Sequence, residues 1–304
     1  MSLTNLTAQV TDDQAGRVGA VVQALTKLSH SKLRGLFDHG CVTVNGELCE
    51  ESGKQVRSGD QVEVRYDPQQ GYPEKKKKWT DRTFQIVFED EHLLVVNKSA
   101  NVLTVATDHW ERNTLEHRVT HYLKSTGHKR QALVVHRLDR GVSGLLVFAK
   151  SPQILAALQE QFKQRKPERL YIAIVAGHPK PDTGTFRSFL ETGDNLDQFS
   201  TRKPGRGELA ITHYQVRKEL PDTSVVEVRL ETGRRNQIRV HFADHGHPVL
   251  GDPRYNRQLA RHERWPPSRL ALHATSLGFI HPATNQPMQF HADLPNLMTR
   301  FIGK

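Results

Sequence analysis

The chain has 304 residues, and an excess of lysine and arginine over acidic residues gives it a formal charge of +10. This charge favours a polyanionic partner, and we expect nucleic acid rather than a membrane surface. Two cysteines provide neither a disulfide framework nor a zinc-site spacing, and no apolar run approaches the roughly 20 residues of a membrane helix. Because no signal peptide is evident either, we expect a cytoplasmic protein without a metal site.

Residues 1–66 predict a small domain of two helices and a hairpin. The first helix has apolar residues at helical spacing, at Val18, Val22 and Leu25. The segment 29–40 predicts a second helix, with a serine at its start and Gly40 at its end. Asn45 and Gly46 then separate two alternating segments, which is the strongest short signal for a β-hairpin. Acidic residues slightly outnumber basic ones here, so only the helical half of this domain is basic.

Residues 67–82 predict a linker between two domains. Its proline and glycine residues interrupt regular structure, and they are Pro68, Gly71 and Pro73. A run of lysines follows at Lys75, Lys76, Lys77 and Lys78. Lysines of this kind bind nucleic-acid phosphates without reading sequence, so this run is a candidate contact; a merely solvated linker is the alternative.

Residues 83–304 form the large domain, in which predicted strands outnumber predicted helices and do not alternate regularly with them. Two apolar segments joined by an acidic turn predict a hairpin over 84–99, and amphipathic helices are expected at 114–124 and 152–166. The segment 132–139 is expected to be a strand followed by a turn, and the other expected strands are 143–151, 168–177, 213–220, 224–231 and 237–246. This order predicts an α+β fold, with helices packed on a mixed, largely antiparallel sheet.

The segment HRLDRGVSGLLVFAK, residues 136–150, places Asp139 between Arg137 and Arg140, just before an apolar strand. The two positive neighbours favour an ionised carboxylate, which suits a nucleophile or a base. Taken alone, the loop is better explained by a surface ion pair, because such pairs are common and weak.

The loop does not stand alone, because three segments resemble, in order, the motifs of the RluA-type pseudouridine synthases. They are HRLDRGVSGLLVFAK, ERLYIAIVAG and TGRRNQIRVHFADHGHPVLGDPRY, and RLALHA at 269–274 is close to a further signature. This resemblance extends from residue 84 to the C-terminus. Residues 28–64 are similar to the alpha-L RNA-binding domain, which implies RNA contacts on its helical side by Arg17, Lys32 and Arg34.

The resemblance implies an enzyme that detaches uracil from ribose, rotates it and rejoins it through carbon 5, without a cofactor. Asp139 is then the essential carboxylate, attacking the anomeric carbon or removing the ribose 2′ proton. Arg239 is expected to pair with it, as a guanidinium fork matched to a carboxylate. Tyr171 offers a ring to pack on the uracil and a hydroxyl able to take the carbon-5 proton.

The same family pattern assigns residues that hold the RNA. Ile238 is expected to line the base pocket, with a simple core role as the alternative. A uridine in folded RNA must leave the base stack first, and Arg137 is positioned by the pattern to enter the gap. Arg140 is expected to meet phosphate.

The chain departs from the family pattern at three positions. Val142 stands where a threonine is usual, and Ser99 and Asn101 replace a common proline and glycine. We expect these departures to affect loop support or substrate choice more than chemistry. The alpha-L resemblance favours ribosomal over transfer RNA as the partner, and a monomer is expected. The alternatives are a catalytically silent RNA-binding or ribosome-assembly factor, and a hydrolase, which needs a second positioned carboxylate.

Overall fold

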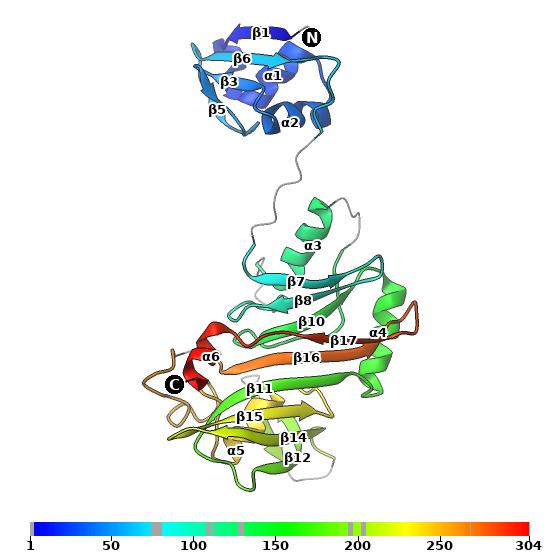
Figure 1. Ribbon diagram of the computed structural model, residues 1–304, viewed down its shortest axis with the longest axis vertical. Coiled ribbons are helices and arrows are strands. Elements are labelled where there is room, and N and C mark those ends of the chain that lie inside the picture. The colour runs from blue at the N-terminus through cyan, green and yellow to red at the C-terminus, as the bar shows by residue number, and fades with distance from the viewer. Residues whose placement is uncertain are drawn as a thin grey trace. The chain divides into compact units, whose positions relative to one another are not determined.

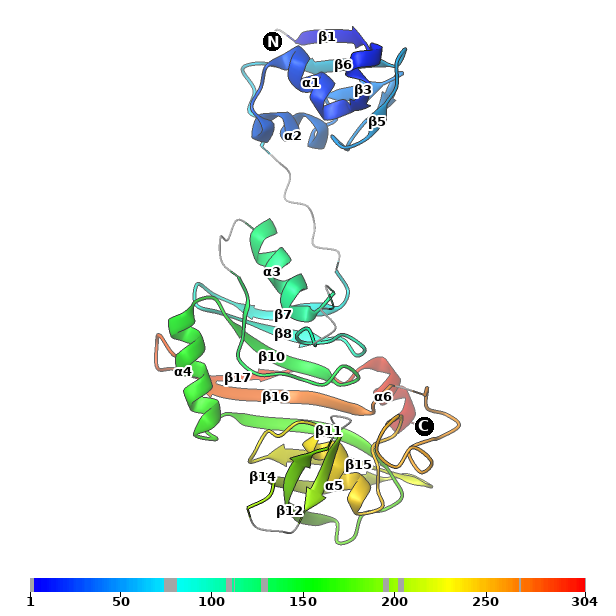
Figure 2. The same ribbon diagram turned by 180° about the vertical axis from the view of Figure 1, so that it is seen from behind.

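The computed structural model describes residues 3–73, 81–107, 111, 113–126, 131–193, 197–201, 205–267 and 269–303. The chain divides between residues 78 and 79 into two compact units. Figures 1 and 2 draw the elements of both units from opposite sides. Within the described residues, no helix is long and apolar enough to cross a membrane.

The N-terminal unit pairs two helices with a small antiparallel sheet, of strand order β1-β6-β3-β4. Its elements are β1 (Thr4–Gln9), the 3₁₀ turn η1 (Asp12–Gln14), β2 (Gly16–Arg17), α1 (Val18–Thr26), α2 (His30–Asp38), β3 (Val42–Val44), β4 (Glu47–Leu48), β5 (Gln55–Val56) and β6 (Gln61–Tyr66). The two predicted helices and the hairpin at Asn45 are present. Sequence reasoning missed β1, an edge strand with no fully buried residue.

The core of this unit lies between the helices and the sheet, where Val18 and Val22 of α1 are fully buried. Residues 67–73 also pack on it, because Tyr72 lies against this core. The Tyr72 hydroxyl accepts a hydrogen bond from the Asp67 amide at 2.8 Å, which holds the segment in a turn. The ring of Tyr72 meets that of Tyr66 edge to face. The first part of the predicted linker therefore belongs to this unit, and the lysines Lys75, Lys76, Lys77 and Lys78 lie outside the described residues.

The C-terminal unit is built on one large sheet of strand order β13-β12-β14-β15-β11-β16-β10-β8-β7, with β17 beside β16 and β9 beside β10 (Figure 1). The strands are β7 (Phe84–Glu89), β8 (Leu93–Lys98), β9 (Leu133–Val134), β10 (Ser143–Ala149), β11 (Glu168–Ala176), β12 (Thr183–Thr192), β13 (Gln198–Thr201), β14 (Glu208–Glu219), β15 (Thr223–Leu230), β16 (Leu272–Ile280) and β17 (Pro287–His291). Of the described strand pairs, β10 with β16 is parallel and the others are antiparallel. The predicted mixed, largely antiparallel α+β fold is confirmed.

Helices pack on this sheet, and they are α3 (Leu115–Ser125), α4 (Pro152–Lys163), α5 (Gln237–Asp244) and α6 (Asn296–Ile302). α3 and α4 form where amphipathic patterns predict them. Thr114 caps α3, Ser151 caps α4, and Pro152 occupies the first turn of α4.

The prediction of a strand over residues 237–246 is wrong, because this segment forms α5 (Figure 2). The first six residues of α5 are all buried, so no polar face reveals the helical period. Ile238 and Phe242, four residues apart, join the main core, while Val240 packs in a separate small cluster. The helix begins after Asn236, which adopts a left-handed conformation with φ of 55°.

Asn101 also adopts a left-handed conformation, with φ of 65°, where the family commonly has glycine. Asparagine tolerates this region through its short polar side chain, whereas a β-branched residue does not. We expect Asn101→Val to lower the free energy of unfolding by roughly 1–2 kcal/mol, and Asn101→Gly to change it little. Urea denaturation of both variants measures the difference, and equal stabilities would show that this backbone position is not constrained.

Candidate active site

Asp139 lies in the loop between β9 and β10, and the loop backbone is hydrogen-bonded at every carbonyl from residue 138 to 141. Four groups donate to these carbonyls: Thr104 Oγ1 to Leu138 at 2.7 Å, Val142 N to Asp139 at 3.1 Å, Lys98 Nζ to Arg140 at 3.3 Å, and Arg269 Nη1 to Gly141 at 3.0 Å. All seven residues of β10 are buried, so the strand that follows is fixed in the core. The loop is therefore a rigid support for its carboxylate.

The carboxylate of Asp139 meets the guanidinium of Arg239, which comes from α5, at 3.2 Å between Oδ2 and Nη1. Asp252 binds the other edge of the same guanidinium with both oxygens, at 2.7 Å to Nε and 2.9 Å to Nη2. Asn236 accepts a further bond from Nη1 at 2.7 Å, and the ring of Tyr255 faces the guanidinium at 4.9 Å. This geometry leaves Arg239 little freedom to move.

Burial and charge act in opposite directions on Arg239. Burial by itself would lower its pKa, but the hydrogen bonds and charge of Asp252, with the charge of Asp139, raise the pKa overall. The side chain of Asp252 is fully buried, whereas that of Asp139 is 22% exposed. The arginine thus stays charged, and the accessible carboxylate in contact with it is Asp139.

A narrow cavity of about 60 Å³ opens beside Asp139, and Tyr171 and Ile238 are among the residues that line it. Tyr171 is buried, and burial raises the pKa of its hydroxyl, with the nearby positive charge of Arg169 opposing the rise. The hydroxyl is therefore protonated in the free enzyme. Ile238 lines the cavity and also belongs to the main core. A position in the cavity wall and a packing role in the core are therefore compatible for this residue.

Lys98 is a buried cation beneath the same loop, 1% exposed at the end of β8. Its ammonium also donates to the carbonyls of Ser99 and Val102, at 3.0 and 2.9 Å. Burial lowers the pKa of Lys98 to about 7, although the charge of Asp139 opposes this shift. A lysine that supports the loop is thus half-protonated near neutral pH.

We expect Lys98 to make the free energy of unfolding depend on pH. Between pH 7 and 10 the unfolded chain holds the Lys98 proton and the folded chain releases it, so the free energy of unfolding rises with pH. Lys98→Met removes this contribution. The free energy of unfolding of the wild type, measured relative to that of the variant, should rise by about 1.4 kcal/mol per pH unit at its steepest. Urea denaturation at pH 7, 8 and 9 measures it, and parallel pH profiles would contradict the shift.

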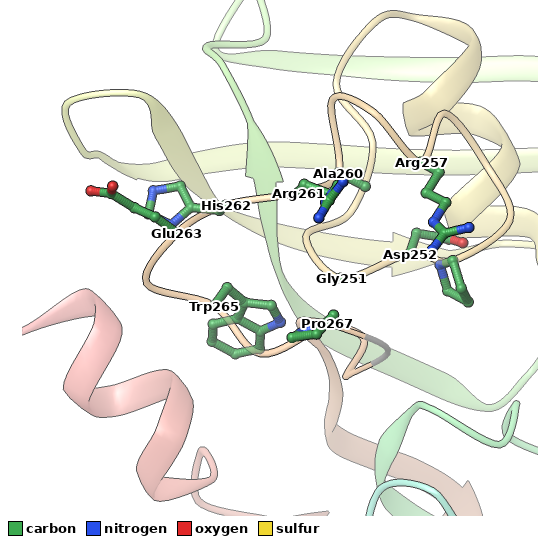
Figure 3. Close-up of a pocket in the computed structure, with 10 residues that line it drawn as sticks. Gly251, Asp252, Arg257, Ala260, Arg261, His262, Glu263, Trp265 and Pro267 are labelled. Carbon is green, nitrogen blue, oxygen red and sulfur yellow. The ribbon is translucent and has the colours of Figure 1, made fainter.

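A larger cavity of about 330 Å³ lies in the loop of residues 251–267. In Figure 3, Asp252 and Arg257 lie at one side of it and His262 and Glu263 at the other. Both oxygens of Asp252 already accept hydrogen bonds from Arg239. Asp252 is therefore committed to Arg239 and is not a free carboxylate for this cavity.

The structure brings together the three predicted catalytic residues, which are Asp139, Tyr171 and Arg239, although they lie far apart in the sequence. The side chains of Arg137 and Arg140 are exposed beside the same loop. The other predicted RNA contacts, Arg17, Lys32 and Arg34, are exposed in the N-terminal unit. Val142 is buried in the main core, so its position offers no place for an unpaired hydroxyl.

Sequence reasoning missed the residues that hold this site in place, above all Asp252. Asp252 lies within the third motif, as part of GDPRY, but only the contact with Arg239 reveals its role. Lys98 and Arg269 were missed in the same way, because a charged residue in an apolar strand or loop gives no sign of which carbonyl it reaches. Among the described residues, no group of three or more His, Cys, Asp or Glu side chains is placed to hold a metal ion.

Comparison with known proteins matches residues 92–244, about half of the chain, to the RNA pseudouridylate synthase family. The chain is 36% identical over 289 residues to ribosomal large subunit pseudouridine synthase D of Zymomonas mobilis, covering 92% of this chain and 90% of that one. It is 30% identical over 332 residues to the protein of the same name in Escherichia coli K12, covering 98% and 93%. Human RNA Pseudouridylate Synthase Domain Containing 4 shares the fold, with a TM-score of 0.59 and 24% identity over 70% of this chain and 90% of that one.

The chain therefore belongs to the RNA pseudouridylate synthase family, as its RluA-type motifs predicted. Its activity is the isomerisation of uridine to pseudouridine in RNA.

Proposed function

We propose that Asp139, held by Arg239, carries this isomerisation, and that the substrate is large-subunit ribosomal RNA. The observation that supports the site is the contact between Asp139 and an arginine that Asp252 fixes from its other edge. The observation that supports the substrate is the shared name of the relatives from Zymomonas mobilis and Escherichia coli. A cytoplasmic location follows from that substrate.

Either route open to Asp139, attack on the anomeric carbon or removal of the 2′ proton, requires the ionised carboxylate. Arg239 supplies the counter-charge at 3.2 Å, and its bonds to Asp252 keep it from moving when Asp139 changes charge during the reaction. A preorganised guanidinium of this kind stabilises a developing charge without reorganising at the moment of reaction.

Tyr171 faces the same cavity and is assigned to the uracil ring. Its flat ring suits packing on a base. Because its pKa is raised, the free enzyme contains no phenolate to serve as a base. The hydroxyl can therefore take the carbon-5 proton only if it gives its own proton to another acceptor. Packing on the uracil requires no such proton transfer.

The RNA contacts extend outward from this cavity. We assign Arg137 to the gap left by the extruded base and Arg140 to a neighbouring phosphate, since both side chains are exposed beside Asp139. Arg17, Lys32 and Arg34 would bind RNA through the N-terminal unit, and the four linker lysines, Lys75, Lys76, Lys77 and Lys78, would add phosphate contacts.

Tritium release from uridine labelled at carbon 5 tests the substrate. We expect release from large-subunit RNA isolated from cells that lack this protein, and no release from the same RNA isolated from cells that contain it. Transfer RNA from the deficient cells is the matched control. Release from transfer RNA alone would overturn the ribosomal assignment while leaving the isomerase in place.

A further inference from the structure

Arg169 is a buried cation that the chemistry at Asp139 does not use. It is 8% exposed, and its Nε is buried without a hydrogen-bond acceptor. Among the described residues, no carboxylate lies within ion-pair distance of its guanidinium, which faces the ring of Phe162 at 5.5 Å. A buried charge without a partner is strongly unfavourable, so a side chain in this state indicates an anion that binds from outside.

The position of Arg169 is set by the strand that also carries Tyr171. The two residues are two positions apart in β11 and are both buried, on the same face of the sheet. A Cβ at Gly233 would lie 2.4 Å from Nη1 of Arg169, so the guanidinium rests against a backbone that has no side chain there. The catalytic tyrosine and the unpaired arginine are thus neighbours on one rigid element.

Arg169 lines a cavity of about 430 Å³ next to the catalytic one. The two cavities share four lining residues, which are Arg137, Tyr171, Leu230 and Arg234. Cations dominate the walls of the larger cavity: Arg137, Lys163, Arg165, Arg169 and Arg234. Its one lining carboxylate, Glu231, is already paired with Arg165 at 3.0 Å and with His213 at 3.3 Å.

Two stacked, uncharged rings also line this cavity, those of His136 and Phe162. His136 stacks on Phe162 with ring centroids 4.6 Å apart. Burial, together with the charge of Arg169, lowers the pKa of His136 to about 3, so this imidazole is neutral. Its Nε2 accepts a bond from the amide of Val147 at 3.3 Å. The positive charge of the cavity therefore comes from its arginines and lysine. Arg165 is paired with Glu231 and Arg234 with Glu208, whereas neither ring balances the charge of Arg169.

We propose that Arg169 binds a phosphodiester of the RNA strand, in a subsite next to the cavity that receives the target uridine. The inference rests on the proposed function, in which RNA enters through that cavity. A guanidinium offers paired N–H donors to phosphate oxygens, and the buried Nε of Arg169 has no acceptor. The one carboxylate that lines its cavity, Glu231, pairs with Arg165 and His213 instead.

Arg169→Met tests the subsite through two measurements, because the protein should become more stable while its productive binding of RNA becomes weaker. Removing an unpaired buried charge should raise the Tm of the free protein by at least about 2 °C. The KM for tritium release from large-subunit RNA should rise about tenfold or more, with kcat changed much less. Arg217→Met is the matched control, because Arg217 is an exposed arginine of β14 paired with Glu227 at 2.7 Å. The control should leave KM unchanged.

Equilibrium binding keeps this test separate from turnover. In an Asp139→Asn background, Arg169→Met should make the plot of log affinity against log salt shallower by about 0.7 to 0.9, the loss of one phosphate contact. Arg169→Lys should retain most of the salt slope, and Gly233→Ala should weaken binding by displacing the guanidinium. If no RNA releases tritium, the proposed function fails, and the salt slope still decides the subsite.

The proposal is overturned if Arg169→Met lowers the Tm and leaves KM unchanged, since the arginine would then be a structural residue. Inorganic phosphate, compared with chloride at equal ionic strength, distinguishes a free anion from RNA. A phosphate-dependent rise in Tm that Arg169→Met abolishes, combined with an unchanged KM and salt slope, would assign the site to a free anion and equally overturn the RNA subsite.

Discussion

Asp139→Asn should lower the rate of pseudouridine formation by at least about 1000-fold, which corresponds to roughly 4 kcal/mol of lost transition-state stabilisation. The amide keeps the shape of the side chain and an oxygen able to accept from Arg239, so the loop remains in place. It cannot act as the nucleophile or the base that either route requires. Single-turnover reactions followed by nucleoside chromatography measure the effect.

The matched control for this variant is Asp182→Asn, which changes a surface carboxylate paired with Lys180. It should leave the rate and the Tm unchanged. RNA affinity should also persist in Asp139→Asn. A rate within tenfold of wild type in Asp139→Asn would show that another residue carries the chemistry.

Asp252→Ala should be the most destabilising single change at the site. It removes the partner of both Nε and Nη2 of Arg239, and the acceptor for the amides of Arg254 and Tyr255. Breaking a buried ion pair in this way costs roughly 3–5 kcal/mol of folding free energy. Catalysis should fall at least about tenfold as well, because an unsupported guanidinium no longer holds Asp139. Urea denaturation and tritium release measure the two effects.

Two further variants test whether the instability of Asp252→Ala comes from the unpaired charge of Arg239 or from a general disruption of the fold. Asp222→Ala removes an exposed carboxylate that pairs with His262, and it should cost less than about 1 kcal/mol. Adding Arg239→Met to Asp252→Ala removes the stranded charge, so stability should recover while activity falls further with the loss of the partner of Asp139. If the double variant is less stable than Asp252→Ala, the buried charge is not the source of the loss.

Much of the fold could be predicted from the sequence, because α3, α4 and several strands have clear periodicity. α3 and α4 show one apolar face each, and β10 is a short apolar run. β1, β12, β13, β16 and β17 were not predicted. The polar alternation of the first three, which lie at or next to a sheet edge, resembles that of loops. α5 was predicted as a strand because burial on all sides removes the polar face of a helix.

The proposed catalytic residues could be selected from motifs, but the residues that support them could not be predicted. Asp139 and Arg239 stand in segments that resemble a family, but their contact spans 100 positions of the chain and follows from the fold alone. Arg169 likewise stands in a recognised motif, yet its lack of a partner depends on what surrounds it in space. Charged residues that act through burial leave no periodic pattern for sequence reasoning to detect.

The central claim is that the Asp139 cavity isomerises uridine without releasing the base. One single-turnover reaction, in which tritium, pseudouridine and free uracil are all quantified, tests it most directly. We predict one tritium released for each pseudouridine formed, no free uracil, and none of these products with Asp139→Asn. Free uracil in place of pseudouridine, or full turnover by Asp139→Asn, would contradict the account.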